Sequence, residues 1–178
     1  MENLYLSLPT GDNLPEEVNV VIEITDQSYV KYEYDHELGI MKLDRMLYAP
    51  MPFPANYGFI PQCWNSDDND PADALVFASH PIQMGVLVPC TIIGLFEMID
   101  SGDKDDKIVC IPADDPLMKH VKTYLDLPEH LRKQIEFYFS VYKNLQNKKV
   151  EVIGFASKEK ALEKITKGIA DHKAKFPG

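Results

Sequence analysis

Short segments with alternating apolar and polar residues fill most of the chain before residue 112. VNVVIEI (18–24) places its valines and isoleucines at 18, 20, 22 and 24 on one face and Glu23 on the other. YVKYEY (29–34) places Lys31 and Glu33 together on one face. Because side chains alternate across a strand, both segments predict β-strands. Further segments of this type are residues 40–46, 74–78, 84–98, 107–111 and 149–155.

Helical patterns are predicted toward the C-terminal end of the chain. They cover residues 114–125, which begin with an Asp-Pro start signal, residues 128–145, and residues 157–176 with Ser157 as N-cap. Strands followed by helices predict a mainly β, α+β fold, with a small closed or nearly closed barrel flanked by helices. The 178 residues suit one domain over 1–178.

The composition excludes several classes of protein. A net charge of −10 argues against nucleic acid or an anionic membrane as a partner. No apolar run has the length of a membrane span, and the acidic N-terminus does not resemble a secretory signal. Cys63, Cys90 and Cys110 are isolated and odd in number, which favours buried free thiols in a reducing, cytoplasmic compartment.

The stretch SDDNDPADALVFA (66–78) crowds aspartates against the start of an apolar strand. Asp68, Asp70 and Asp73 form the pattern D-x-D-P-x-D, and Pro71 excludes a helix interior. In an extended chain Asp68 and Asp70 point the same way, and a turn at Pro71 would bring Asp73 beside them. Such carboxylates repel unless they are protonated or bridged by cations. Hard oxygen ligands of this kind suit Mg²⁺ or Mn²⁺.

A second acidic loop, IDSGDKDDK (99–107), carries Asp100, Asp103, Asp105 and Asp106 and ends at Lys107. Either loop alone is compatible with a solvated turn. Two such loops at strand ends favour a shared metal site. An EF-hand does not fit, because the fifth and sixth positions counted from Asp68 are alanine and aspartate rather than a ligand and a glycine.

The candidate cationic and phenolic groups are fewer. Lys31 shares a strand face with Glu33, and an ion pair between the two would be enough to explain both residues. Arg45 follows Asp44. Tyr57 lies in PANYGF, which is predicted to be a turn. Tyr142 falls on the apolar stripe of the long helix, so, taken alone, core packing explains it better than function does. Lys143, taken alone, would be an ordinary surface lysine.

Taken together, these motifs resemble those of the family I soluble inorganic pyrophosphatases over nearly the whole chain. DNDPAD matches the family signature D-x-D-P-x-D before an apolar strand. The other matching elements stand around it in the family's order: VVIEI, VKYEYD, LDR, NYGFIP, DSGDKDDK and VYKNL.

The resemblance implies a five-stranded barrel of the oligonucleotide/oligosaccharide-binding (OB) type and Mg²⁺-dependent hydrolysis of pyrophosphate to two orthophosphates. Mn²⁺ or another divalent cation could substitute, and members of this length are usually homohexamers. The implied metal-binding residues are Asp68, Asp70, Asp73, Asp100 and Asp105, with Asp70 as general base on the attacking water. The implied phosphate-binding residues are Lys31, Arg45, Tyr57, Lys107, Tyr142 and Lys143. Glu23 and Glu33 would be outer-shell or additional metal carboxylates.

One position departs from the family pattern. Phe53 stands where the family often has a tyrosine, so a phenolic contact to phosphate is lost there. Three other classes of protein remain open from the residues: an acidic Ca²⁺-binding module, a nucleic-acid-binding barrel, and a phosphohydrolase acting on nucleotides or phosphate esters.

Overall fold

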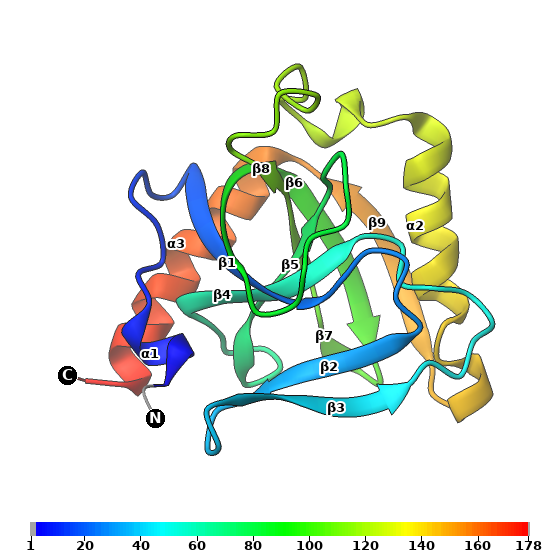
Figure 1. The fold of residues 1–178 in the computed structure, drawn as a ribbon, viewed down its shortest axis with the longest axis horizontal. Coiled ribbons are helices and arrows are strands. Elements are labelled where there is room, and N and C mark those ends of the chain that lie inside the picture. Colours follow the sequence, from blue (N-terminus) through cyan, green and yellow to red (C-terminus); the bar gives the residue numbers. More distant parts are fainter. Residues whose placement is uncertain (1–2, 178) are drawn as a thin grey trace.

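The computed structural model, which describes residues 3–177, contains a closed five-stranded barrel (Figure 1). The strands pair in the order β1–β4–β5–β8–β6, and β6 then pairs with β1 to close the barrel. β5 and β8 run parallel, whereas the other barrel pairs are antiparallel. The barrel strands are β1 (Glu17–Ile24), β4 (Asn56–Asn65), β5 (Asp70–Val76), β6 (Leu87–Asp100) and β8 (Lys107–Pro112). The predicted OB-type barrel is confirmed.

The remaining elements decorate this barrel. β7 (Asp103–Lys104) and β9 (Val150–Ala156) extend the sheet from β6, and β2 (Val30–Asp35) pairs with β3 (Ile40–Met46) as a separate hairpin. Figure 1 shows the two long helices on opposite sides of the barrel. The helical segments are α1 (Leu4–Ser7), α2 (Glu129–Val141), α3 (Lys158–Lys175) and the 3₁₀ turns η1 (Tyr124–Asp126) and η2 (Asn144–Gln146).

The alternation in β1 has a direct structural consequence. Val18, Val20 and Ile22 pack into a core cluster that Ile165 of α3 covers. Val21 faces the other way, into an aromatic cluster formed by Tyr5, Tyr34 and Phe59. Both faces of β1 are therefore buried, one under the C-terminal helix and one under the N-terminal segment and the hairpin.

The predicted free cysteines are confirmed, since Cys63, Cys90 and Cys110 are all buried and unpaired. The predicted helices over 128–145 and 157–176 correspond to α2 and α3, and the Ser157 side chain accepts from Lys160 N at the start of α3. α2 ends at Val141, so Tyr142 and Lys143 lie just beyond its last turn.

The predicted helix over 114–125 is wrong. The segment forms a series of turns, in which Met118 N donates to Asp115 O and Val121 N donates to Met118 O. The Asp115 carboxylate accepts from Ser79 N at 2.7 Å and from Leu117 N at 3.1 Å. These bonds tie the segment to the connection after β5, and a side chain that bonds nearby backbone in this way competes with helix formation.

The turn predicted in PANYGF is also wrong, because β4 begins at Asn56 and already includes Tyr57 and Gly58. Gly58 pairs with Ile22 of β1 and with Ala74 of β5. A Cβ atom on Gly58 would lie 1.9 Å from Val21 O, so glycine is required here for a close approach between strands. The turn that orients the first acidic loop lies before Pro71 rather than at it, since Pro71 is already within β5, opposite Trp64.

Gly58→Ala should therefore destabilise the barrel strongly. The added methyl group meets backbone, which cannot move aside without separating β1 from β4. We expect a loss of about 3 kcal/mol in the free energy of unfolding, measured by urea denaturation. A denaturation midpoint equal to that of the wild type would show that the two strands do not approach this closely.

Candidate active site

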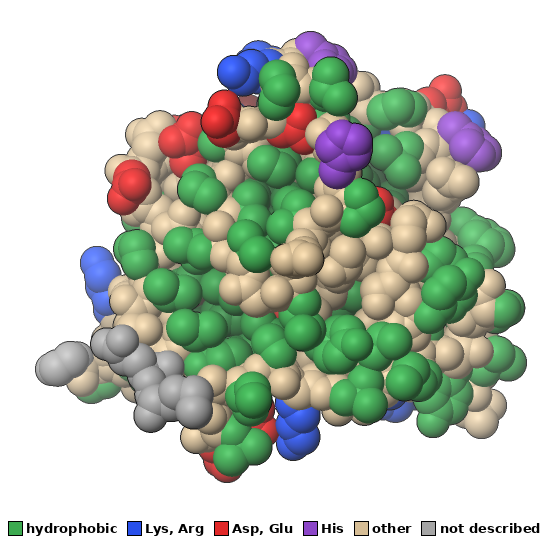
Figure 2. Space-filling view, in the orientation of Figure 1, with side chains coloured by type: hydrophobic (Ala, Val, Ile, Leu, Met, Phe, Trp, Pro, Cys, Tyr) green, Lys and Arg blue, Asp and Glu red, His purple; other side chains and the backbone are tan. Residues whose placement is uncertain are grey.

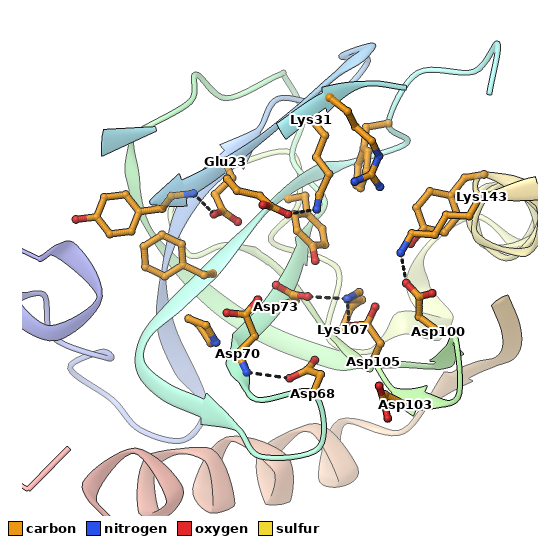
Figure 3. Close-up of a pocket in the computed structure, with 18 of the residues that line it drawn as sticks. Glu23, Lys31, Asp68, Asp70, Asp73, Asp100, Asp103, Asp105, Lys107 and Lys143 are labelled. Atoms are coloured by element: carbon orange, nitrogen blue, oxygen red, sulfur yellow. Dashed lines mark hydrogen bonds and ion pairs between the residues drawn. The ribbon is translucent and has the colours of Figure 1, made fainter. Parts of the chain in front are cut away.

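All of the residues predicted from the sequence to form the site line one cavity of about 700 Å³ between the barrel and the β2–β3 hairpin (Figure 3). They are Glu23, Lys31, Glu33, Arg45, Tyr57, Asp68, Asp70, Asp73, Asp100, Asp105, Lys107, Tyr142 and Lys143. Phe53 lines the same cavity. Residues from both acidic loops therefore meet in one place.

The parallel pairing of β5 with β8 brings the two acidic loops together. In its register Asp73 lies opposite Lys107, so the D-x-D-P-x-D motif and the DSGDKDDK motif meet at the same edge. Lys107 Nζ donates to Asp73 Oδ2 at 2.6 Å and also to Asp105. One ammonium group thus links a carboxylate from each loop.

Lys107 is only 3% exposed, and its ammonium lies 5.5 Å from the centre of the Tyr57 ring. Burial lowers the pKa of this lysine, but Asp73 and Asp105 outweigh burial and raise the pKa above its ordinary value. Lys107 therefore remains charged, and it compensates part of the negative charge that surrounds it.

The aspartates that lack an ammonium partner are under electrostatic stress. Burial, with Asp73 and Asp105 nearby, raises the pKa of Asp68 to about 7. Asp70 is exposed at the cavity, and partial burial together with Asp73 raises its pKa to about 6. Both carboxylates are held in surroundings that disfavour their negative charge.

The hairpin supplies positive charge from the opposite wall. Lys31 on β2 is paired with Arg45 on β3, so their side chains leave neighbouring positions. Lys31 donates to Glu33, and Arg45 donates to Asp44 through Nη1. Arg45 Nε is buried and has no hydrogen-bond partner among residues 3–177. The Arg45 side chain lines the cavity, and a guanidinium group in such a place is suited to an anionic ligand.

Tyr142 and Lys143 approach the cavity from the end of α2. Lys143 donates to Asp100, which ties this end of the helix to the second acidic loop. Burial lowers the pKa of Lys143 despite its carboxylate partner. Tyr142 also packs in the core cluster, which confirms the core-packing interpretation, and its side chain lines the cavity as well.

Glu23 lies beneath the hairpin. It is 8% exposed, and its Oε1 accepts from Tyr34 N at 2.7 Å. Burial raises its pKa to about 8 although this hydrogen bond works to lower it. Glu23 therefore connects a barrel strand to the backbone of the hairpin.

Several residues that line the cavity were not predicted to belong to the site, among them Tyr34, His36, Asp103 and Lys148. Asp103 lies within an acidic loop, so its charge and position were a usable signal. Tyr34 and His36 gave none, because nothing in the hairpin sequence shows that their part of β2 and the following turn closes one side of the cavity.

Several of the cavity's carboxylates are paired with lysines: Asp73 and Asp105 with Lys107, and Asp100 with Lys143. Among residues 3–177, no three His, Cys, Asp or Glu side chains lie in an arrangement that would by itself hold a metal ion.

Over the same residues, no helix is both long enough and apolar enough to cross a membrane.

Comparison with known proteins shows the family of this chain. Residues 20–173 match the family model described as inorganic pyrophosphatase. The chain belongs to the inorganic pyrophosphatase family. It is a hydrolase that acts on pyrophosphate.

Relatives and solved structures cover nearly the whole chain. An inorganic pyrophosphatase of Picrophilus torridus is 43% identical over 166 residues, covering 93% of each chain. Soluble inorganic pyrophosphatase 1 of Arabidopsis thaliana is 44% identical, covering 89% of this chain and 74% of its own. The crystal structure of the inorganic pyrophosphatase of Thermus thermophilus matches with a TM-score of 0.93 at 39% identity, covering 97% of this chain and 99% of that one.

Proposed function

We propose that this enzyme hydrolyses pyrophosphate with Mg²⁺ as its cofactor and Asp70 as the general base. The observation that carries the proposal is the division of one cavity into an acidic wall and a cationic wall. Asp68, Asp70 and Asp73 lie on the barrel side, while Lys31 on β2 and Arg45 on β3 come from the hairpin. Such a cavity matches a polyanionic substrate accompanied by divalent cations.

The donor set fits Mg²⁺. Carboxylate oxygens are the protein ligands that this hard cation prefers. The raised pKa values of Asp68 and Asp70 show that their negative charges are poorly compensated by the protein. A divalent cation would supply the missing positive charge, and Mn²⁺ offers similar chemistry. Asp73 and Asp105 would then share their oxygens between the cation and Lys107.

The chain's own residues would divide the reaction between them. Bound Mg²⁺ would neutralise phosphate charge and lower the pKa of a coordinated water. Asp70 would accept the proton of the attacking water at its carboxylate oxygen. The exposed position of Asp70 in the cavity gives that water access. The backbone N–H of Asp70 donates to Asp68 Oδ1 at 3.2 Å, and this bond fixes the turn before Asp70.

The cationic wall would hold the two phosphate groups. The guanidinium group of Arg45 and the ammonium groups of Lys31 and Lys143 are suited to phosphate oxygens. Lys107 and the hydroxyl groups of Tyr57 and Tyr142 would bind from the cavity floor. Glu33 and Glu23 would act as outer-shell or additional metal carboxylates.

Phe53 cannot join these phosphate-binding groups, because it lacks the phenolic hydroxyl of the tyrosine that the family often has at this position. The ring is 2% exposed and packs edge-on against Tyr57, with 5.2 Å between ring centres. Phe53 therefore supports the Tyr57 ring from behind without donating a hydrogen bond to phosphate.

Orthophosphate release tests the proposal directly. We expect rapid release from pyrophosphate with Mg²⁺, little with Ca²⁺ in its place, and little from ATP under the same conditions. Release that Ca²⁺ supports equally, or that prefers ATP, would contradict the proposed cofactor or the proposed substrate preference. A low-salt band-shift assay with DNA and RNA addresses the nucleic-acid alternative, for which we expect no binding.

Asp70→Asn should lower turnover by roughly 10²–10⁴-fold, because the amide keeps the shape of the carboxylate but cannot accept the proton. Mg²⁺ binding, measured by calorimetry, should largely persist. Asp114→Asn is a suitable control, since the Asp114 side chain is fully exposed and lies outside the cavity lining. Near-normal turnover in Asp70→Asn would remove Asp70 from the role of base.

Millimolar Mg²⁺ should raise the thermal unfolding temperature of the metal-free protein. A cation that binds only the folded state stabilises it by mass action, and here it also relieves repulsion among the aspartates. Differential scanning calorimetry at pH 8 with MgCl₂ or with EDTA measures the shift. An unfolding temperature that is the same in both would count against a metal site in this cavity.

We also propose that the enzyme is a cytoplasmic homo-oligomer, and a hexamer by resemblance to its family. One structural feature supports association between copies. Met84 and Val86, in the connection between β5 and β6 that crosses the front of Figure 1, and Leu87, at the start of β6, are exposed. Figure 2 shows apolar side chains spread over much of this face, which is typical of an interaction surface. Sedimentation equilibrium would give the number of subunits.

A further inference from the structure

Not every aspartate of the acidic loops faces the cavity. Asp67 in the first loop and Asp106 in the second are absent from its lining. Asp106 stands between Asp105 and Lys107, which both line the cavity, so its side chain leaves the opposite side of the chain. Asp67 lines a small space beside α3 instead.

Lys164 of α3 meets both of these outward aspartates. Its Nζ lies 3.3 Å from Asp106 Oδ2 and 3.7 Å from Asp67 Oδ2. A third oxygen, Asn65 Oδ1, lies 3.4 Å away. Two N–H donors of this ammonium therefore have hydrogen-bond acceptors, Asp106 and Asn65, and Asp67 adds an ion pair beyond hydrogen-bond distance. The Lys164 side chain is only 15% exposed, which makes this contact more constrained than a surface ion pair.

Asn65 links Lys164 to Asp68, one of the proposed metal-binding residues. Its amide oxygen is turned toward the Lys164 ammonium, so its amide nitrogen must face the other way. There Nδ2 donates to Asp68 Oδ2 at 2.8 Å. Flipping the amide would place two sets of N–H donors against each other, so Lys164 fixes the orientation of Asn65 and, through it, of Asp68.

Asp106 carries a second constraint. Its Oδ1 accepts from Met98 N at 3.2 Å, which binds the second loop to β6. Its other oxygen faces Lys164. The side chain of Asp106, the next residue after Asp105, therefore fixes the backbone that places Asp105 in the cavity, through its contacts with Met98 N and Lys164.

We propose that Lys164 is a positioning residue that holds the two acidic loops at a fixed spacing and thereby sets the affinity of the site for Mg²⁺. In Figure 3 the C-terminal helix passes directly beneath both loops, as this role requires. The proposal rests on the proposed function, because it assumes that the inward carboxylates bind Mg²⁺.

Two other roles for Lys164 give different results when its charge is removed. If the ammonium acted only through its electric field, its loss would leave the site more negative, and Mg²⁺ would bind more tightly. If Lys164 only stabilised the fold, the unfolding temperature would fall and Mg²⁺ affinity would stay the same. Loss of a positioning contact weakens Mg²⁺ binding, because the carboxylates are no longer held in place.

The test is calorimetric titration of MgCl₂ into metal-free protein at pH 7.5 without pyrophosphate. Lys164→Met keeps the apolar stem and removes the charge, and it should weaken Mg²⁺ binding about tenfold, the lower end of what loss of an outer-shell partner costs. Lys164→Arg keeps the donors and the charge, and it should stay within about threefold of the wild type by the same measure.

Lys160→Met is the matched control. Lys160 lies one turn earlier on α3 and pairs with Glu97 at 3.1 Å, with its side chain 57% exposed. This variant loses the same charge from the same helix without touching either acidic loop, so its Mg²⁺ affinity should equal that of the wild type.

Asn65→Ala provides an independent variant that leaves the net charge unchanged. It removes the link to Asp68, so it should also weaken Mg²⁺ binding. Its effect should be smaller than additive when combined with Lys164→Met, because both changes break the same connection.

Unchanged or tighter Mg²⁺ binding in Lys164→Met, or unchanged binding in Asn65→Ala, overturns the proposal. A wild-type protein that neither binds Mg²⁺ nor requires it for orthophosphate release would overturn the proposed function as well. That failure would already appear in the wild type, before any variant is compared.

Discussion

The contact on which the site depends is the buried ammonium of Lys107 between Asp73 and Asp105. The two carboxylates come from separate loops whose like charges would otherwise drive them apart. The parallel register of β5 and β8 sets Lys107 opposite Asp73, so the main-chain pairing of the barrel places the charge where it is needed. Removing one partner from a buried group of this kind leaves an uncompensated charge, which is why the arrangement depends on all of its members.

Around this contact, different parts of the fold supply opposite charges. The barrel and its loops carry most of the acidic groups, whereas Lys31 and Arg45 come from the hairpin and Lys143 from the end of α2. The hairpin is a separate sheet, so its position relative to the barrel depends on side contacts. In one of these contacts Tyr34 N donates to the Glu23 carboxylate. In another, Leu4 N donates to the Tyr34 hydroxyl at 2.9 Å. Elements far from the chemistry therefore set the distance between the two walls of the cavity.

The acidic loops show the same division of tasks within a few residues. Alternation along the backbone sends Asp105 into the cavity and Asp106 toward α3. The inward carboxylates face the cavity, while the outward ones are anchored to Lys164. A loop of aspartates that all pointed one way would have no such anchor, and repulsion would splay it.

The sequence by itself determined the residue types of the site, the barrel class and the long amphipathic helices, because periodicity and motif spacing are local properties. It also predicted which residues would line the cavity, through the resemblance of their order to a known family. It did not predict the strand beginning at Asn56, since Gly58 resembles a turn residue until Val21 is seen against it. Nor did it exclude a helix over 114–125, because the bond from Ser79 N to Asp115 joins residues 36 positions apart.

Only the tertiary structure decided which aspartates face the cavity, which lysine compensates which loop, and what lies behind them. Lys164 and Asp106 are separated by 58 residues along the chain, and nothing in either local pattern connects them. Charge and spacing are written in the sequence, but the direction of each side chain follows from strand register and helix docking. Those depend on burying the apolar surface of the whole chain at once.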